Sequence, residues 1–390
     1  MTIRHLMSCR GWSSDAYWAA RITAELDRAG HQVALVCKRG TEARVIDRAR
    51  GLGAPGLDTL RFQSGLHPAS DVADLRQLLR WLPSTDVLHV HRGKEHWLAA
   101  LANRFSGSPR PLFRTRHIVQ PVQPHPMNRW LYGTATTAVV AVTEAIRRQY
   151  VAAELMDPAR VVTLPGGVDL RCFHPGVDGA RFRAQLGVPD GVPLIGLLAG
   201  LRVMKGHGVV LEAAAELARR GRAFHLVLAG RGHMEGQVRQ AVAEAGLGDR
   251  VSLPGFIEDL PAAIAAFDVA LYPPLESEGM SRVLFEYLAT GRAIVASRVG
   301  VVPEVLRDGE SALLVPAAEP RPLADAIDRL LGDRALRAGL GAAAAALCAA
   351  RLSGARVAER LAELYDAAVP AARTRGQSPL LPRGRSPLQR

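Results

Sequence analysis

Two glutamates in the second half of the chain have the type and spacing of sugar-binding carboxylates. An expected strand at 268–272 is followed by a loop that begins with two prolines and contains Glu278. Glu286 lies inside the next helical segment, among Val, Leu, Phe and Tyr. A surface position for Glu286 would not explain an acid among these apolar residues. A carboxylate in such a segment needs a polar partner. Paired carboxylates accept hydrogen bonds from the vicinal hydroxyls of a sugar or ribose. The intervening backbone N–H groups predict a phosphate-binding helix N-terminus at Gly279, Met280, Ser281 and Arg282.

A second group of candidate residues lies in the loop 200–207, between an expected strand and an expected helix. Arg202 and Lys205 stand there between two glycines, next to a helix N-terminus. Full charges, free N–H groups and a helix dipole together suit a diphosphate, although a solvated basic loop remains an alternative. The chain has no GxxxxGK[ST] motif and no GxGxxG after its first strand, which disfavours an ATPase and a simple dinucleotide-binding protein.

The first half of the chain holds the residues expected to face an acceptor. The segment 89–97 follows a strand and combines His, Arg, Lys and Trp, and Trp12 can stack on a sugar ring. His91 and His96 raise the possibility of zinc, but no Cys or acid completes a ligand set, so no metal site is expected. His89 is expected on the opposite face of its strand from His91, in a structural role. The acceptor-side candidates are Gly11, Trp12, His91, Arg92 and Lys94.

Charge is distributed unevenly along the 390 residues. Residues 1–170 hold 22 Lys and Arg against 14 Asp and Glu, residues 171–370 hold 22 against 23, and residues 371–390 hold five Arg and no acid. A basic first half attracts an anionic acceptor or anionic lipid headgroups. Nucleic acid is disfavoured, because no helix-turn-helix, RRM or zinc-finger signature is present. The Arg tail and the basic surface predict peripheral membrane contact at most.

The cysteines and the apolar segments point to the cytoplasm. The four cysteines form no CxxC pair, which disfavours a disulfide framework. Residues 1–11 contain no apolar signal segment, and no stretch of about 18 apolar residues lacks a charge, so neither a secretory signal nor a membrane-spanning helix is expected.

Strands and helices are expected to alternate in two successive series, which predicts two doubly wound parallel sheets. The expected strands are 2–8, 33–37, 86–91, 111–117 and 137–142, and then 193–199, 224–229, 250–253, 268–272, 293–297 and 312–315. The fold class is therefore α/β, with two Rossmann-like domains facing a cleft. The expected domains are 1–175 and 176–352, with a helix at 353–370 that can pack back on the first domain and a basic disordered tail at 371–390.

Several motifs, in order, resemble those of the family-4 retaining glycosyltransferases, which have the GT-B fold. Glu278 and Glu286 match the E-x7-E motif, and residues 200–206 resemble the Arg-x-x-Lys-Gly loop. Residues 227–232, 253–256, 289–297 and 302–316 resemble further motifs of the nucleotide-sugar domain, while 164–169 and 30–33 resemble motifs of the first half. The similarity covers nearly the whole chain except the tail. Gly166 replaces the usual Asn of the "PNGVD" motif, and Met280 and Ser281 replace a common Phe and Gly.

The resemblance implies a role for each matching residue. Arg202 and Lys205 would neutralise the donor diphosphate, which is the leaving group, in place of a metal ion. Glu286 would bind the ribose, and Glu278 would hold hydroxyls of the donor sugar. Contacts to the base would come from Gly230, Arg231, Phe256 and Ile257. His117 matches a histidine that approaches the donor sugar, so Glu278 and His117 are the catalytic candidates.

The resemblance thus implies a metal-independent retaining glycosyltransferase that uses a nucleotide-diphosphate sugar, with UDP ahead of GDP, and no cofactor. An anionic cell-surface glycan or glycolipid would be the acceptor, as in similar lipopolysaccharide-core enzymes, at the inner face of the cytoplasmic membrane. Two alternatives stay open: a sugar-nucleotide 2-epimerase of the same fold, which turns over without an acceptor, and a catalytically silent sugar-nucleotide-binding partner.

Overall fold

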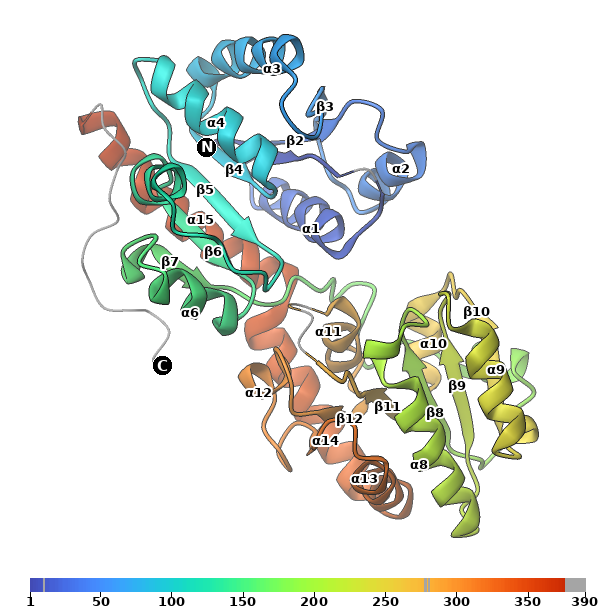
Figure 1. Ribbon diagram of the computed structural model, residues 1–390. Helices are drawn as coiled ribbons and strands as arrows, with labels where there is room; N and C mark the ends of the chain where they lie inside the picture. The colour runs from blue at the N-terminus through green and yellow to red at the C-terminus, as the bar shows by residue number, and fades with distance from the viewer. Residues whose placement is uncertain (10, 277–278, 280, 376–390) are drawn as a thin grey trace. The chain divides into compact units, whose positions relative to one another are not determined.

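The chain forms two compact units, one of which is assembled from both ends of the sequence. The computed structural model describes residues 1–9, 11–276, 279 and 281–375 (Figure 1). The first unit comprises Met1–Gly167 and Gly354–Arg390, and the second comprises Val168–Ser353. The boundary expected after residue 175 lies inside the second unit as the structure divides it.

The first unit is built on a seven-stranded sheet in the order β3-β2-β1-β4-β5-β6-β7, with every described strand pair parallel. The strand order reverses between β1 and β4, which is where open α/β sheets bind ligands. The strands are β1 (Thr2–Met7), β2 (Gln32–Lys38), β3 (Leu57–Leu60), β4 (Val87–Val90), β5 (Leu112–Arg116), β6 (Ala138–Ala141) and β7 (Val161–Thr163). The helices are α1 (Ser14–Arg28), α2 (Ala43–Gly51), α3 (Pro68–Trp81), α4 (Gly93–Phe105), α5 (Pro126–Asn128), α6 (Glu144–Ala152) and α15 (Gly354–Arg375).

The second unit is built on a six-stranded parallel sheet in the order β10-β9-β8-β11-β12-β13. The strands are β8 (Leu194–Leu198), β9 (His225–Ala229), β10 (Val251–Gly255), β11 (Val269–Tyr272), β12 (Ala293–Ser297) and β13 (Leu313–Val315). The helices are α7 (Ala180–Gln185), α8 (His207–Arg219), α9 (Glu235–Glu244), α10 (Leu260–Ala266), α11 (Arg282–Ala289), α12 (Val302–Val305), α13 (Pro320–Gly332) and α14 (Arg334–Leu347). Two Rossmann-like parallel sheets confirm the predicted α/β class.

Side-chain alternation along the central strands fills a core on each face of the second sheet. On β8, Leu194 and Leu198 belong to one buried cluster, and Ile195 and Leu197 belong to another. Successive residues of a strand point to opposite faces, so a strand covered by helices on both faces is apolar throughout. This explains why the continuous apolar runs of this unit were recognisable as strands.

The C-terminal helix α15 belongs to the first unit, where it packs against α1 (Figure 1). Val357, Leu361 and Tyr365 are its most deeply buried side chains. The helix extends to Arg375, past the expected start of the tail at residue 371, and the remaining tail lies outside the described residues.

One described helical segment, Arg334–Leu352, is long and apolar enough to cross a membrane by length and composition. It consists of α14 and the π-helical turn Cys348–Leu352. In the structure it packs against α11, α13 and β12 of the second unit. Leu340, Ala344 and Cys348 are buried in these contacts. One face of the segment is thus packed against this unit.

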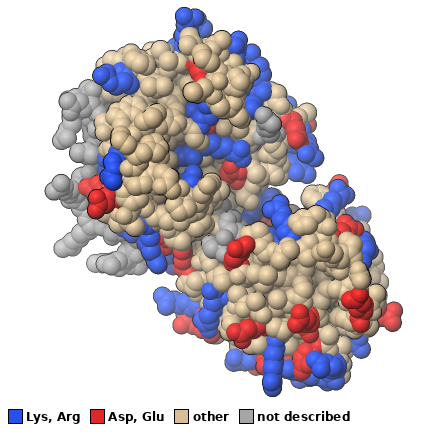
Figure 2. Space-filling view, viewed as in Figure 1, with Lys and Arg blue, Asp and Glu red and all other residues tan. Residues whose placement is uncertain are grey.

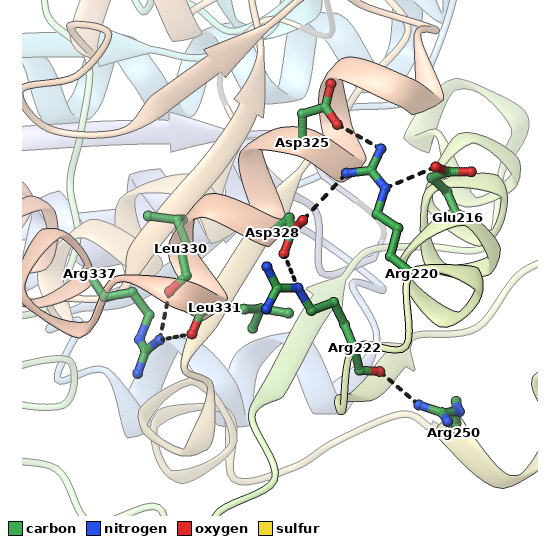
Figure 3. Close-up of polar contacts among 9 residues, drawn as sticks. All are labelled: Glu216, Arg220, Arg222, Arg250, Asp325, Asp328, Leu330, Leu331 and Arg337. Carbon is green, nitrogen blue, oxygen red and sulfur yellow. Dashed lines mark hydrogen bonds and ion pairs between the residues drawn. The ribbon is translucent and has the colours of Figure 1, made fainter.

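An ionic network joins α8 to α13 in the second unit (Figure 3). The Arg220 guanidinium lies 2.9 Å from Glu216, 2.7 Å from Asp325 and 3.5 Å from Asp328, measured between nitrogen and oxygen atoms. Arg222 reaches the second carboxylate oxygen of Asp328 at 2.5 Å. Isolated surface ion pairs contribute little to stability, but several charges sharing partners contribute more.

The variant Arg220→Met is expected to lower the melting temperature, because it removes three ion pairs at once and leaves the carboxylates of Glu216 and Asp325 without this shared cation. The matched control is Arg239→Met, which removes one exposed pair with Glu235 and should leave the melting temperature nearly unchanged. Circular dichroism melts at low salt and in about 1 M salt test both, since salt screens the network. Equal melting temperatures for the two variants would show that the network contributes no more than an isolated pair.

Candidate active site

The loops that follow β8, β9, β10 and β11 meet at one edge of the second sheet. Backbone hydrogen bonds connect them: Leu201 N–H to Arg231 O at 3.1 Å, Leu275 N–H to Met204 O at 2.9 Å, and Gly230 N–H to Gly255 O at 2.8 Å. This edge carries the predicted donor-site residues Arg202, Lys205, Gly230, Arg231, Phe256, Ile257, Ser281 and Arg282. The parallel strands thus bring together residues that lie up to 80 positions apart, from Arg202 to Arg282.

Two glycines allow the loops to approach so closely. Gly206 has φ +74°, and a Cβ atom there would lie 2.1 Å from the carbonyl oxygen of Pro273. Gly230 has φ +148°, and a Cβ there would lie 1.9 Å from the carbonyl oxygen of Ala199. Any side chain at either position would force the loops apart. Gly206 therefore fixes the Arg202–Lys205 loop against the loop after β11.

Glu286 is a buried carboxylate with one oxygen committed and one available. It lies in α11, where its side chain is 2% exposed, and its Oε1 lies 2.9 Å from Nε of Arg282. Its Oε2 has no hydrogen-bond partner among the described residues. Burial raises the pKa of Glu286, and Arg282 partly opposes this rise. An unsatisfied buried acceptor is suited to a ligand hydroxyl.

Tyr287, the neighbour of Glu286, connects α11 to the end of β8, just before the loop that holds Arg202 and Lys205. The backbone N–H of Leu198, at the end of β8, donates a hydrogen bond of 2.8 Å to the Tyr287 hydroxyl oxygen. Tyr287 is fully buried. This contact fixes the distance between Glu286 and the residues after β8. This contact was not predicted from the sequence, in which Tyr287 is one of several apolar residues of the helix.

Two of the four predicted base-contacting residues, Phe256 and Ile257, line a pocket of about 340 Å3 within the second unit. Phe256 and Ile257 form part of its wall, together with Phe182 of α7 and Ala262 of α10. The guanidinium carbon of Arg231 lies 5.6 Å from the centre of the Phe256 ring. A cation over an aromatic face and an adjacent hollow are features to which a planar base can bind.

Two of the predicted donor-site residues, Glu278 and Met280, lie outside the described residues. Gly279 has φ +79° and Ser281 is buried at the N-cap of α11, where its side chain forms no capping hydrogen bond. Of the two glutamates in the E-x7-E motif, the structure therefore describes the second, Glu286.

In the first unit, His117 follows β5 and lies at the end of a group of stacked imidazoles. Its Nε2 lies 3.2 Å from Nδ1 of His91, and the two ring centres are 5.5 Å apart. Burial lowers the pKa of His117 to about 4, against the opposing charge of Asp15. At neutral pH His117 is thus a neutral imidazole with one donor and one acceptor nitrogen.

The placement expected for His89 is wrong, and His91 is not at the surface. His89 and His91 are two positions apart, so strand geometry puts both on the same face, and their rings stack at 5.0 Å. His91 is buried and both of its ring nitrogens are hydrogen-bonded to other histidines. This leaves His91 behind His117 rather than in position to contact an acceptor directly.

The other acceptor-side candidates are spread over the carboxyl edge of the first sheet. Arg92 lies 2.8 Å from Asp15, and its side chain remains 40% exposed. Lys94 lies 2.6 Å from Asp71 and donates a 2.7 Å hydrogen bond to Gly65 O. Trp12 packs edge-on against Tyr17 at 6.2 Å, and Gly11 is half-buried nearby. Both cations are thus partly neutralised within the unit.

A basic pocket that the sequence analysis did not identify lies beside them. It has a volume of about 560 Å3 and opens between the end of β2, the loop after β3 and the start of α3. Lys38, Arg39 and Arg61 supply three positive charges, and the described lining contains no carboxylate. In the view of Figure 2, Lys and Arg gather over the first unit, whereas the second unit shows both signs side by side. The lining residues are Lys38, Arg39, Arg61, Gln63, Ser64, His67 and Ser70.

Comparison with known proteins gives matches over both units. The model of Glycosyltransferase Family 4 matches residues 16–171, and that of Glycosyl transferases group 1 matches residues 192–333. A D-inositol 3-phosphate glycosyltransferase of Nocardia farcinica (strain IFM 10152) is 31% identical over 379 residues, covering 86% of this chain and 82% of the relative.

Solved structures share the fold. A glycosyltransferase of Rickettsia africae ESF-5 gives a TM-score of 0.81 at 18% identity, covering 94% of this chain and 97% of its own. A protein of Anabaena solved in complex with UDP gives 0.79 at 19% identity, covering 94% and 100%. The predicted GT-B architecture is confirmed by these matches. This chain belongs to the glycosyltransferases of group 1 and family 4, and it is a sugar-transferring enzyme.

The variant Glu286→Gln is expected to abolish stabilisation by a nucleotide ligand without lowering the stability of the free protein. The native state raises the pKa of Glu286 and so binds its proton more tightly than the unfolded chain. Wild-type stability therefore falls as pH rises above the unfolded pKa of about 4.3, and Gln lacks this loss. Thermal melts of both proteins at pH 4 and pH 7, with and without nucleotide, test this. A free variant that melts well below wild type at pH 7 would contradict it.

Proposed function

We propose that this glycosyltransferase moves a sugar, with retention of anomeric configuration, from a nucleoside-diphosphate sugar to an acceptor that carries phosphate or carboxylate. UDP is the proposed nucleotide, with GDP second. Arg202 and Lys205 stabilise the departing diphosphate without a metal ion, and Glu286 binds the ribose. His117 and Glu278 are the proposed catalytic residues, each acting on the donor sugar.

The donor side of the proposal is supported by what gathers at one sheet edge. Arg202 and Lys205 occupy the loop after β8. Glu286, with its unsatisfied oxygen, lies in the helix after β11, and the pocket lined by Phe256 lies next to the end of β10. A diphosphate, a ribose hydroxyl and a base are the three parts of a nucleoside diphosphate that such groups suit. The Anabaena protein, whose structure was solved in complex with UDP, shares this fold.

The observation that carries the acceptor side is the basic pocket of Lys38, Arg39 and Arg61. Three cations around about 560 Å3 with no described carboxylate in the lining favour an anionic ligand. A phosphorylated polyol fits this volume, as does the phosphorylated headgroup of a glycolipid. The relative of Nocardia farcinica is named for D-inositol 3-phosphate, so that compound is the first acceptor to test. A lipid-linked or lipopolysaccharide-type acceptor at the cytoplasmic face of the membrane is the second.

Addition of UDP or a UDP-sugar is expected to raise the melting temperature of wild type, and GDP and ADP should do so less. At a ligand concentration of about 100 Kd the stabilisation is about 2.7 kcal/mol. The double variant Arg202→Ala/Lys205→Ala should lose the response, because the diphosphate loses both of its cations. With the sugar donor identified, proton NMR of the product at the anomeric centre checks retention.

Three outcomes would contradict this assignment. Turnover of the donor without any acceptor to a 2-epimer would indicate the epimerase alternative. Nucleotide binding with neither transfer nor hydrolysis would indicate the silent partner. No response to any nucleotide in wild type would remove the donor assignment itself.

The variants Lys38→Ala and Arg61→Ala are expected to raise KM for a phosphorylated acceptor about 10- to 100-fold, the value of a hydrogen bond to a charged group. The KM for the donor should stay the same. Arg44→Ala is the matched control, because Arg44 is exposed and pairs with Glu42 outside the pocket. Initial-rate kinetics with D-inositol 3-phosphate and with vesicles of an anionic glycolipid distinguish the two acceptor sources. An unchanged acceptor KM in both variants would show that the pocket does not bind the acceptor.

A further inference from the structure

Behind His117, a continuous row of hydrogen-bonding groups crosses the interior of the first unit. His91 Nδ1 lies 3.2 Å from His117 Nε2, and His91 Nε2 lies 3.1 Å from His5 Nδ1. His5 Nε2 lies 3.5 Å from the hydroxyl of Tyr365, which is the longest step. The same hydroxyl bonds Nδ1 of His89, whose Nε2 lies 2.6 Å from the Thr115 hydroxyl. We call this row, from Thr115 to His117, the histidine chain.

Strand geometry explains why these side chains meet. His5 and His89 are register partners on the neighbouring strands β1 and β4, so they lie side by side. His91 is two positions after His89, and His117 is two positions after Thr115, which keeps all of them on one sheet face. Trp18 of α1 and Tyr365 of α15 cover that face, and Trp18 packs edge-on against His91 at 5.7 Å and against His117 at 5.4 Å.

Each imidazole of the histidine chain is neutral at physiological pH. Burial lowers the pKa of His5 to about 3 and holds the pKa values of His89 and His91 well below 6.5. A neutral imidazole has one N–H donor and one acceptor nitrogen. In a row of such rings every hydrogen bond must point the same way, since each ring that donates at one nitrogen accepts at the other.

The three bonds from Tyr365 through His5 and His91 to His117 therefore have two self-consistent directions, because both rings between the ends must donate at one nitrogen and accept at the other. In one, Tyr365 donates to His5, His5 Nδ1–H donates to His91, and His91 Nδ1–H donates to His117 Nε2, so the proton of His117 is on Nδ1. In the other, His117 Nε2–H donates to His91, His91 donates to His5 and His5 donates to Tyr365, so Nδ1 of His117 is an acceptor. Among the described residues no hydrogen bond reaches Nδ1, which is the nitrogen not used by the chain. Asp15, Arg92 and Arg116 are the charged groups that act on His117 from outside it, and Arg114 acts from within the sheet.

We propose that His5 and His91 are positioning residues, which determine through the histidine chain which ring nitrogen of His117 carries its proton. The free nitrogen of His117 is thereby fixed as a donor or as an acceptor before substrate binds. The consequence for sugar transfer rests on the function proposed above. The tautomer itself does not depend on that function.

A buried metal site is the competing interpretation, because the ring nitrogens of His5, His89 and His91 lie within 4.8 Å of one another. Both nitrogens of His89, however, are bonded to Tyr365 and Thr115, and both nitrogens of His91 are bonded to histidines. The rings of His5 and His89 also stack at 12° to each other rather than converging on a point. The geometry is that of a hydrogen-bonded row rather than of a ligand set.

Two substitutions of His5 separate a hydrogen-bonding role from a space-filling role. His5→Phe keeps a ring of similar size and removes the bond to His91. His5→Asn is smaller, but its amide can occupy the position of Nδ1 and restore that bond. A packing role predicts that Phe is tolerated better than Asn, whereas the histidine chain predicts the opposite order.

The readout is the tautomer of His117, measured by long-range proton–nitrogen NMR on the full-length chain labelled with 15N-histidine, with the signal assigned by its loss in His117→Gln. Wild type and His5→Asn are expected to show one tautomer, and His5→Phe a mixture. Where a donor has been identified, kcat should fall about tenfold in His5→Phe, the value of one buried hydrogen bond, with the donor KM unchanged. His5→Asn should recover it to within about twofold.

Tyr365→Phe interrupts the histidine chain at a second point and serves if His5→Phe does not fold. It is expected to shift the tautomer of His117 in the same way. Tyr150→Phe is its control, because it also removes a buried hydroxyl from the first unit but lies outside the histidine chain. The proposal is overturned if His117 keeps its wild-type tautomer in both His5→Phe and Tyr365→Phe, or if purified wild type holds one zinc ion per chain. Absence of transfer with the expected tautomer shift would instead contradict only the proposed function.

Discussion

Parallel strand pairing is the constraint on which the rest of this structure depends. In a parallel sheet all carboxyl ends meet at the same edge, so the loops that follow the strands become neighbours whatever their separation in sequence. Leu201 bonds Arg231, Gly230 bonds Gly255 and Leu275 bonds Met204 at one such edge. The same constraint in the first unit places Lys38 at the end of β2, and Arg39 after it, beside Arg61 after β3. Each half of the enzyme thus brings the charged residues of its candidate site to one edge of its sheet.

Buried polar groups connect these edges to the cores beneath them. Glu286 is held by Arg282, and α11 is held by the bond from Leu198 to Tyr287. In the first unit, neutral imidazoles take the place of apolar side chains on a face that α1 and α15 cover. Leaving one of these groups without its partner costs more than the bond contributes, so each network holds its members in one arrangement. The positions of the candidate site residues are in this way determined by buried polar contacts in the core beneath them.

The sequence predicted the second sheet better than the first. All six strands from β8 to β13 were recognisable, and all of them except β10, which contains Ser, Pro and Gly, are predominantly apolar runs. The edge strand β3 was missed, since Leu57–Leu60 has Asp and Thr between its two leucines, and the short strand β7 was missed as well. At the sites, motif order indicated Arg202, Lys205 and Glu286. The histidine chain was not predictable, because His5, His89 and Tyr365 come from distant segments and no motif relates them.

The return of α15 to the first unit has a consequence for the order in which the protein is made. The hydrogen bond between His89 and Tyr365 joins residues 276 positions apart, with the whole of Val168–Ser353 synthesised between them. The second unit is continuous in sequence, so it has all its strands available before the first unit has its covering helix. Until α15 emerges from the ribosome, the face that bears His5, His89 and Phe113 lacks part of its cover. Such an incomplete sheet face is a surface that chaperones recognise, and closing it over so long a separation is intrinsically slow.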